Sequence, residues 1–114
     1  MAYVTTIDVL GITPKEYRAI LDEMGVELRP EPGIYLHLTA PIEGGYRITE
    51  VWDHREGFEA FMQARLAPAA EAIGLNREMK LTIEPLYNIF APRLDELPPL
   101  VEDAFLRPNA PIPA

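Results

Sequence analysis

The stretch of residues 34–62 constrains the fold most, because it predicts a β-hairpin that runs directly into an amphipathic helix. Residues 34–39 and 46–53 are expected to form the two strands, and Gly44 and Gly45 between them can supply the positive φ angles of a tight turn. We expect Asp53 to be the N-cap of the helix, with Glu56 three residues later. The predicted buried stripe of this helix consists of Phe58, Phe61, Met62 and Leu66.

The N-terminal part of the chain predicts a strand followed by a helix. Residues 3–9 are β-branched and half polar, which is typical of a strand. Thr13, Pro14 and Glu16 have the spacing of a capping box with proline at the first helical position. The stripe of this helix is predicted to be Tyr17, Ile20, Leu21 and Met24, and Gly25 is expected to end it. Prolines in residues 26–33 predict a loop before the hairpin.

The C-terminal part predicts a broken helix, one strand and an arm. Pro68 is expected to kink or restart the second helix, which should end at Gly74. Residues 79–90 are expected to form a last strand that is interrupted or bent at Pro85. Six of the 12 prolines lie in residues 92–114. We therefore predict a folded domain over residues 1–91 and a proline-rich arm over 92–114 that packs on the body or on a partner subunit.

The expected order of elements is β-α-β-β-α-β. With right-handed crossovers, this order gives a four-stranded antiparallel sheet with two helices on one face. The predicted class is therefore α+β with the ferredoxin-like arrangement.

Composition narrows the functional classes. A chain of 114 residues is long enough for one domain with its own core. Its formal charge of −8 and the absence of a basic stripe argue against nucleic acid as a partner. It has no cysteine, so disulfides and thiolate sites are excluded. Because neither a signal peptide nor a membrane-spanning apolar run is visible, we expect a cytoplasmic protein that does not enter membranes.

The alternation of side chains divides the hairpin into two sets. If Glu43 and Gly44 form the turn, the cross-strand pairs are His37 with Glu50, Tyr35 with Trp52, and Thr39 with Ile48. We expect these pairs on the face of the sheet that carries no helix. The remaining set, expected under the helices, is Ile34, Leu36, Leu38, Thr49 and Val51.

The set that contains His37 and Glu50 is too apolar to lie in water and too polar for a dry core. The same face of a second subunit would cover it, and so we predict a homodimer.

His37 and Glu50 are the candidates for catalysis. A neutral imidazole beside a carboxylate can act as a general base, because the carboxylate orients the ring and stabilises the imidazolium. The alternative is a structural histidine that Glu50 satisfies. Trp52 and Tyr35 could stack on a planar aromatic molecule, or they could simply fill the interior.

Further candidates for binding are Thr39, Ile48, Tyr87 and Asp8. Asp8 would add a carboxylate if it shares a face with Val4 and Thr6. Although His37, Glu50 and Asp8 are suitable ligand types, no characteristic spacing supports a metal site, and we predict none. Neither a dinucleotide-binding nor a phosphate-binding glycine motif occurs, so no cofactor is expected.

Residues 45–53, 56–61 and 88–90 resemble the antibiotic-biosynthesis-monooxygenase-like domains of the dimeric α/β-barrel proteins. The resemblance covers roughly residues 3–91 and implies the same barrel. The family includes cofactor-independent oxygenases of polyphenolic or quinone-forming substrates, heme-degrading enzymes, cyclases and small proteins of other roles. In the oxygenases, the resemblance implies a pocket between sheet and helices, with a tryptophan at the position of Trp52 in its wall.

These features predict a cofactor-independent, monooxygenase-like enzyme that acts on a small apolar or aromatic molecule, such as a polyketide. His37 would be the base, Glu50 its partner, and Tyr35, Trp52 and Tyr87 the walls of the pocket. The alternatives are a cyclase or isomerase with the same base, and a non-catalytic, ligand-binding accessory protein. A heme-processing role is the third alternative.

Overall fold

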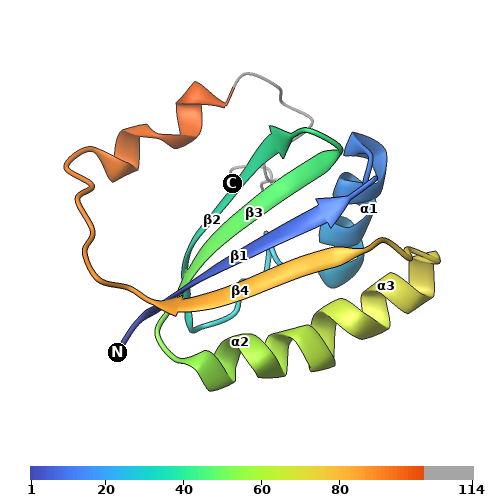
Figure 1. Cartoon of the computed structure of the whole chain (residues 1–114), viewed down its shortest axis with the longest axis horizontal. Helices are drawn as coiled ribbons and strands as arrows, with labels where there is room; N and C mark the ends of the chain where they lie inside the picture. Colours follow the sequence, from blue (N-terminus) through green and yellow to red (C-terminus); the bar gives the residue numbers. More distant parts are fainter. Residues whose placement is uncertain (102–114) are drawn as a thin grey trace, which may run out of the picture.

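The computed structural model describes residues 1–101, which form a four-stranded antiparallel sheet with helices on one side (Figure 1). The strands lie in the order β2-β3-β1-β4. Their bounds are Tyr3–Leu10 for β1, Ile34–Ile42 for β2, Gly45–Trp52 for β3 and Met79–Pro85 for β4. This topology confirms the predicted ferredoxin-like α+β fold, and it makes β2 and β4 the edge strands.

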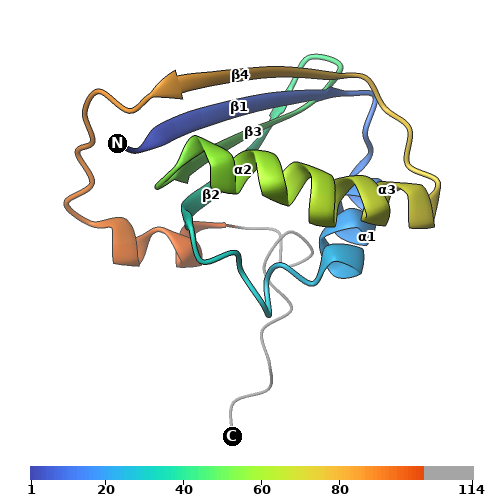
Figure 2. The ribbon, with the colours of Figure 1, turned by 90° about the horizontal axis from the view of Figure 1, so that it is seen from below.

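The helices form a layer on one face of the sheet (Figure 2). They are α1 (Pro14–Met24), α2 (Arg55–Phe61) and α3 (Ala67–Ile73), and a π-helical turn over Met62–Leu66 joins the last two. No helix among residues 1–101 is long and apolar enough to span a bilayer.

Helix α1 begins and ends as predicted. The Glu16 N–H donates to the Thr13 hydroxyl over 3.1 Å, and the Thr13 N–H donates to the Glu16 carboxylate over 3.0 Å. Gly25 follows the helix with φ +67°, and its N–H bonds to the Leu21 carbonyl. The capping box and the glycine therefore fix the ends of the helix that carries Tyr17.

The start of α2 differs from the prediction. His54, not Asp53, is the N-cap, and its side chain makes no capping hydrogen bond. The Asp53 N–H instead donates to the Gly33 carbonyl over 2.9 Å, which joins the end of β3 to the start of β2. The α-helical pattern of α2 changes to the π-helical turn, in which the Ala67 N–H donates to the Met62 carbonyl five residues back. Helix α3 then begins one residue before Pro68.

The hairpin turns at Glu43 and Gly44, where Gly44 has φ +83°. A Cβ at Gly45 would collide with the Val9 carbonyl oxygen, so this position also requires glycine. The predicted pairs His37 with Glu50 and Thr39 with Ile48 are confirmed.

The predicted pair of Tyr35 with Trp52 is wrong. An irregularity between Ile34 and Leu36 places Ile34 opposite Trp52 and leaves Tyr35 as an additional residue. Tyr35 is consequently 68% exposed.

The assignment of the two faces is also wrong. His37, Glu50 and Trp52 lie on the face under the helices, because Tyr17 of α1 contacts His37 and Phe58 of α2 packs on Trp52. Alternation predicts which residues share a face, but it does not predict which face the helices cover. The helix-free face carries Leu36, Leu38, Thr49 and Val51. These residues were predicted to lie under the helices, and of that set only Ile34 does.

The core lies between the sheet and the helices. Its buried residues are Ile7, Val9, Ile12, Tyr17, Ile20, Leu21, Met24, Trp52, Phe58 and Ala69. Trp52, at the end of β3, is only 1% exposed and packs against Phe58 and Phe61 of α2.

Strand β4 ends at Pro85, short of the predicted residue 90. Pro85 has no N–H to donate to the ladder, and one further backbone hydrogen bond follows, from the Leu86 N–H to the Ala2 carbonyl over 2.8 Å. Two 3-10 turns follow at Leu94–Glu96 and Pro98–Leu100. Residues 102–114 of the predicted arm lie outside the described residues, so the packing of the arm stays a prediction.

Candidate functional site

His37 and Glu50 face each other from neighbouring strands. The Nδ1 atom of His37 lies 2.8 Å from Oε2 of Glu50. The His37 side chain is 33% exposed, whereas that of Glu50 is 6% exposed. The pair therefore spans the boundary between the surface at β2 and the interior under the helices.

Trp52 completes the surroundings of the carboxylate. Its Nε1–H donates to Oε1 of Glu50 over 3.0 Å, so each carboxylate oxygen has a partner. The indole packs edge-on against Phe58 and at a tilt against Phe61, with ring centroids 5.7 and 5.5 Å apart. Helix α2 thus holds Trp52, and Trp52 holds the buried Glu50.

Tyr17 of α1 engages the other ring nitrogen of His37. Its hydroxyl lies 2.8 Å from Nε2 of His37 and 2.6 Å from Oγ1 of Thr39, and Thr39 is 3.1 Å from Nε2. Since the Glu50 carboxylate is an acceptor, the network assigns the proton of neutral His37 to Nδ1. The Nε2 atom then accepts from the Tyr17 hydroxyl, which accepts from Thr39.

Burial is the main cause that raises the pKa of Tyr17. The negative charges of Glu27 and Glu50 act in the same direction, while the hydrogen bond with Thr39 and the charge of Arg18 oppose them. Tyr17 is therefore a neutral phenol that can donate to His37 at neutral pH.

The structure brings most of the predicted site residues together. His37, Glu50, Thr39 and Trp52 share one hydrogen-bonded chain, and Ile48 lies on the same face opposite Thr39.

Three predicted residues lie elsewhere. Tyr35 is exposed at the irregularity of β2, and Tyr87 is 100% exposed beyond β4. Asp8 lies on the helix-free face, as Val4 and Thr6 do, where Arg47 binds it through two hydrogen bonds of 2.7 and 2.9 Å. Arg47 lowers the pKa of Asp8 mainly by hydrogen bonding. These residues do not contribute to the chain around His37.

Tyr17 is the site residue that the sequence prediction missed. Its position in the stripe of α1 marked it as a core residue, which it is. A tyrosine in a buried stripe also needs a partner for its hydroxyl, and the polar residues of the facing strand could have supplied that signal.

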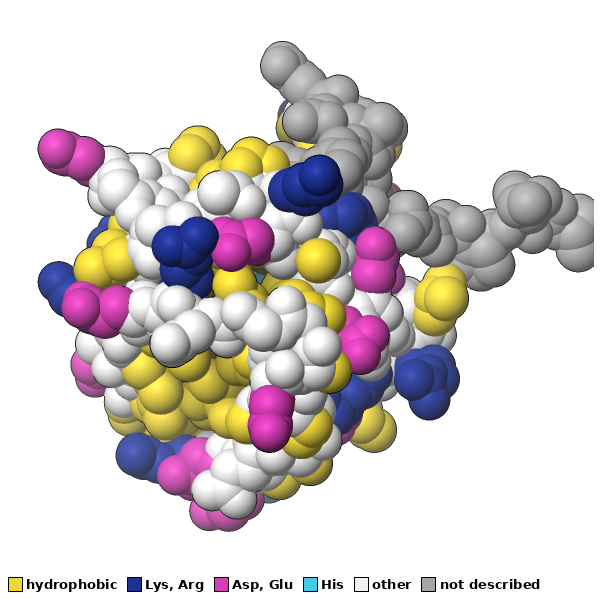
Figure 3. Space-filling view, turned by 90° about the vertical axis from the view of Figure 1, so that its right-hand side faces the viewer, with side chains coloured by type: hydrophobic (Ala, Val, Ile, Leu, Met, Phe, Trp, Pro, Cys, Tyr) yellow, Lys and Arg dark blue, Asp and Glu magenta, His cyan; other side chains and the backbone are white. Residues whose placement is uncertain are grey.

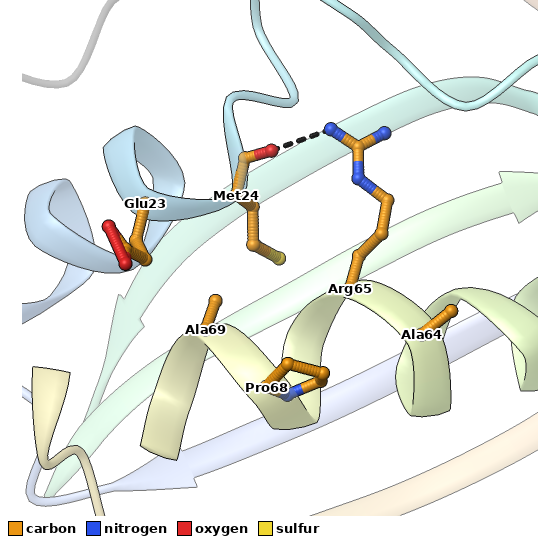
Figure 4. A pocket seen from close by; sticks show the side chains of 6 residues that line it. All are labelled: Glu23, Met24, Ala64, Arg65, Pro68 and Ala69. Carbon is orange, nitrogen blue, oxygen red and sulfur yellow. Dashed lines mark hydrogen bonds between the residues drawn. The ribbon is translucent and has the colours of Figure 1, made fainter. Parts of the chain in front are cut away.

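Two shallow hollows lie away from His37. One, of about 270 Å³, lies between the end of α1 and the π-helical turn (Figure 4). In it, Arg65 donates to the Met24 carbonyl over 2.6 Å, and so its guanidinium serves to close the end of α1. The other, of about 190 Å³, lies between the start of α1 and the end of α3. Neither hollow includes His37, Glu50 or Trp52.

The helices leave part of their face of the sheet open. Met79 and Leu81 of β4 pair with Val9 and Ile7 of the core, yet both are exposed. Seen from the end of the molecule that carries α1, hydrophobic side chains gather in a patch between charged ones (Figure 3). Among residues 1–101, no group of three or more metal-ligating side chains lies together.

Comparison with solved structures finds the same fold in several proteins. The chain is similar to SnoaB, a cofactor-independent oxygenase from Streptomyces nogalater, at 18% identity and a TM-score of 0.54, over 78% of this chain and 94% of that one.

Two further structures have the same fold. A protein from Deinococcus radiodurans that has been provisionally assigned as an antibiotic biosynthesis monooxygenase is 20% identical. Its TM-score is 0.58, over 79% of this chain and 96% of that one. A variant of MhuD with two manganese protoporphyrin IX molecules per active site is 14% identical, with a TM-score of 0.58 over 77% and 97%. No family model and no curated protein matches the chain. At these identities, the likeness shows the fold alone.

Proposed function

We propose that this protein is a small-molecule enzyme of the cofactor-independent, monooxygenase-like type, and that His37 is its base. The observation that carries the proposal is the His37–Glu50 pair, in which a partly exposed imidazole is hydrogen-bonded to a buried carboxylate. This arrangement suits a general base, because Glu50 stabilises the imidazolium that forms.

The substrate would be an aromatic or polyketide-like molecule with a weakly acidic hydroxyl. His37 removes the proton, and the anion that remains is electron-rich enough to react with dioxygen. Trp52 holds Glu50 in place rather than meeting the substrate directly, since it is fully buried. The fold shared with SnoaB supports the oxygenase type.

A cyclase or isomerase would use the same proton abstraction and differ only in what the anion does next. A non-catalytic accessory protein would bind the same molecule without changing it. Product analysis separates these roles: oxygen enters the product in the first case, the mass is unchanged in the second, and no product forms in the third.

Porphyrin binding is the second candidate, because MhuD has the same fold and holds a manganese porphyrin. Both ring nitrogens of His37 are already engaged, by Glu50 and by Tyr17, which opposes iron ligation by this residue. A titration with hemin tests whether the protein binds porphyrin. A Soret band that shifts with the natural chain but not with His37→Ala would favour porphyrin binding at His37.

The proposal includes a homodimer formed through the helix-free face. Leu38 on this face is 42% exposed, and Leu36 and Val51 lie beside it in the register. A charge in this patch should prevent association. We expect a dimer by light scattering for the natural chain and a monomer for Leu38→Glu. Ala72→Glu, which adds the same charge at an exposed position of α3 in the helix layer, is the control. We also propose a cytoplasmic location, which is the expectation from the sequence.

Oxygen uptake tests the enzymatic proposal. The protein is mixed with naphthol and larger fused-ring phenols, and oxygen consumption is followed with an electrode. We expect uptake that falls by about a hundredfold or more in His37→Ala. His54→Ala, which changes the other histidine, should leave it unchanged. If none of the phenols is consumed or bound, the proposal is wrong.

A further inference from the structure

The His37 ring is partly exposed, but the hydroxyls of Tyr17 and Thr39 both lie within hydrogen-bond distance of its Nε2 atom. We propose that they form a relay that carries a proton from a hydroxyl compound bound at Thr39 to Nε2 of His37. The inference rests on the proposed role of His37 as a base and adds the route by which the proton reaches it.

Both nitrogens of the imidazole are engaged inside the protein. Nδ1 faces Glu50 at 2.8 Å, and Nε2 faces the Tyr17 hydroxyl at 2.8 Å. A ligand therefore cannot bond to either nitrogen without displacing a side chain. Thr39 is half-buried, and its hydroxyl lies 2.6 Å from that of the buried Tyr17, so Thr39 is the outer of the two hydroxyls.

A hydroxyl donates one hydrogen bond and accepts others, and so this chain can reverse its direction. In the neutral state, Thr39 donates to Tyr17, Tyr17 donates to Nε2, and Nδ1–H donates to Glu50. When His37 is an imidazolium, Nε2–H donates to Tyr17, Tyr17 donates to Thr39, and Thr39 donates outward.

The step balances in atoms and charge. The ligand hydroxyl gives its proton to Oγ1 of Thr39, Thr39 gives its own to the Tyr17 oxygen, and Tyr17 gives its own to Nε2. Three O–H bonds break, and two O–H bonds and one N–H bond form. The ligand is left as an oxyanion that accepts a hydrogen bond from Thr39, and the imidazolium is left beside the Glu50 carboxylate.

The charged groups around the chain favour transfer of a proton through Tyr17 over ionisation of Tyr17. Glu50 of β3 and Glu27 after α1 both disfavour a phenolate, Arg18 opposes them, and burial raises the pKa of the phenol. Arg18 pairs with Glu27 and Asp22, which keeps its charge beside the helix. A relay needs such a phenol, because it gives and receives a proton in the same step.

A second and longer contact exists between Thr39 and Nε2, at 3.1 Å. If Tyr17 loses its hydroxyl, the proton can still cross this contact, although less readily. If Thr39 loses its hydroxyl, the outward end is lost for both routes. The relay therefore predicts that Thr39 matters more than Tyr17.

The rate at which His37 exchanges its proton with solvent tests the relay without any ligand. Nitrogen NMR on protein labelled at its histidines reports this rate by line broadening during a pH titration. The chain has two histidines, and His54→Gln identifies the signal of His37. The variants are Thr39→Val, Thr39→Ser and Tyr17→Phe. The control is Tyr46→Phe, whose ring packs edge-on to Tyr17 at 5.8 Å but whose hydroxyl is outside the chain.

We expect exchange to be about tenfold slower or more in Thr39→Val, as the loss of one hydrogen-bonded link would give. Tyr17→Phe should slow it less, and Thr39→Ser and Tyr46→Phe should leave it unchanged. Equal rates in Thr39→Val and the natural chain would overturn the relay, since the proton would then reach the ring directly. Failure of oxygen uptake alone would instead overturn the enzymatic proposal and leave the relay standing.

Discussion

The two faces of the sheet each carry a pair of charged or titratable side chains from neighbouring strands, and the pairs behave differently. On the helix-free face, Arg47 donates two hydrogen bonds to Asp8, and the Arg47 side chain is half exposed. On the helix face, His37 and Glu50 form a pair of which the carboxylate is buried. The register between strands brings both pairs together in the same way.

The helices account for the difference. Arg47 is half exposed and Asp8 is 19% exposed, so water reaches this pair more readily than it reaches Glu50, which is 6% exposed. Glu50 depends on Trp52 and His37 for its hydrogen bonds, and His37 in turn depends on Tyr17 of α1. A cross-strand pair on the helix face therefore becomes part of a chain whose members cannot be removed singly without cost.

Removal of Glu50 should have the largest effect. Glu50→Ala leaves the Trp52 N–H and the Nδ1–H of His37 without an acceptor next to an empty space. We expect a loss of about 3 kcal/mol in the free energy of unfolding, measured with urea. Asp8→Ala is the matched carboxylate on the other face and should cost far less. Similar losses for both would show that burial does not distinguish the pairs.

Tyr17→Phe should cause the next largest loss in the free energy of unfolding. It keeps the ring that packs on Tyr46 but removes the hydroxyl that binds His37 and Thr39. We expect a loss of about 1 kcal/mol by urea unfolding. A variant as stable as the natural chain would mean that the hydroxyl contributes nothing to the fold.

Alkaline pH should weaken the natural chain more than Tyr17→Phe. Burial raises the pKa of Tyr17 above its value in the unfolded chain, so the folded state holds the phenolic proton more tightly. This contribution to stability is complete below the unfolded pKa and is lost as the pH rises through the folded one. Thermal unfolding at increasing pH measures it, and parallel curves for the two proteins would contradict the assignment.

The smallest expected effect on the free energy of unfolding is the loss of the Asp8–Arg47 pair at acid pH. Arg47 lowers the pKa of Asp8, so the pair stabilises the fold above the unfolded pKa of Asp8, and this is lost as the pH falls through the folded one. Arg47→Gln should therefore flatten the acid side of the stability curve. An unchanged curve would show that the surface pair has no measurable role.

Local signals in the sequence predicted much of the fold. The capping box at Thr13 and Glu16 and the hairpin turn at Glu43 and Gly44 depend on residues close in the chain, and both are confirmed. The register followed from the turn, and it correctly placed His37 opposite Glu50.

Long-range packing decided what the sequence could not show. Leu36 and Leu38 are as apolar as core residues, yet they lie on the helix-free face, because Ile7 and Val9 of β1 lie under the helices together with Glu50 and Ile48. The irregularity at Tyr35 shifts one end of β2 and removes this residue from the site. No pattern along the chain encodes either outcome.

Nitrogen NMR of His37 at a pH where the ring is neutral tests the central claim most directly. The claim is that Glu50 and Tyr17 hold the imidazole with a proton on Nδ1 and a bare, hydrogen-bonded Nε2 that can accept a proton. We predict a protonated Nδ1 signal and an unprotonated Nε2 signal, and Glu50→Gln should mix the two forms. A proton on Nε2 in the natural chain would contradict the claim, because His37 could then not act as a base through Tyr17 and Thr39.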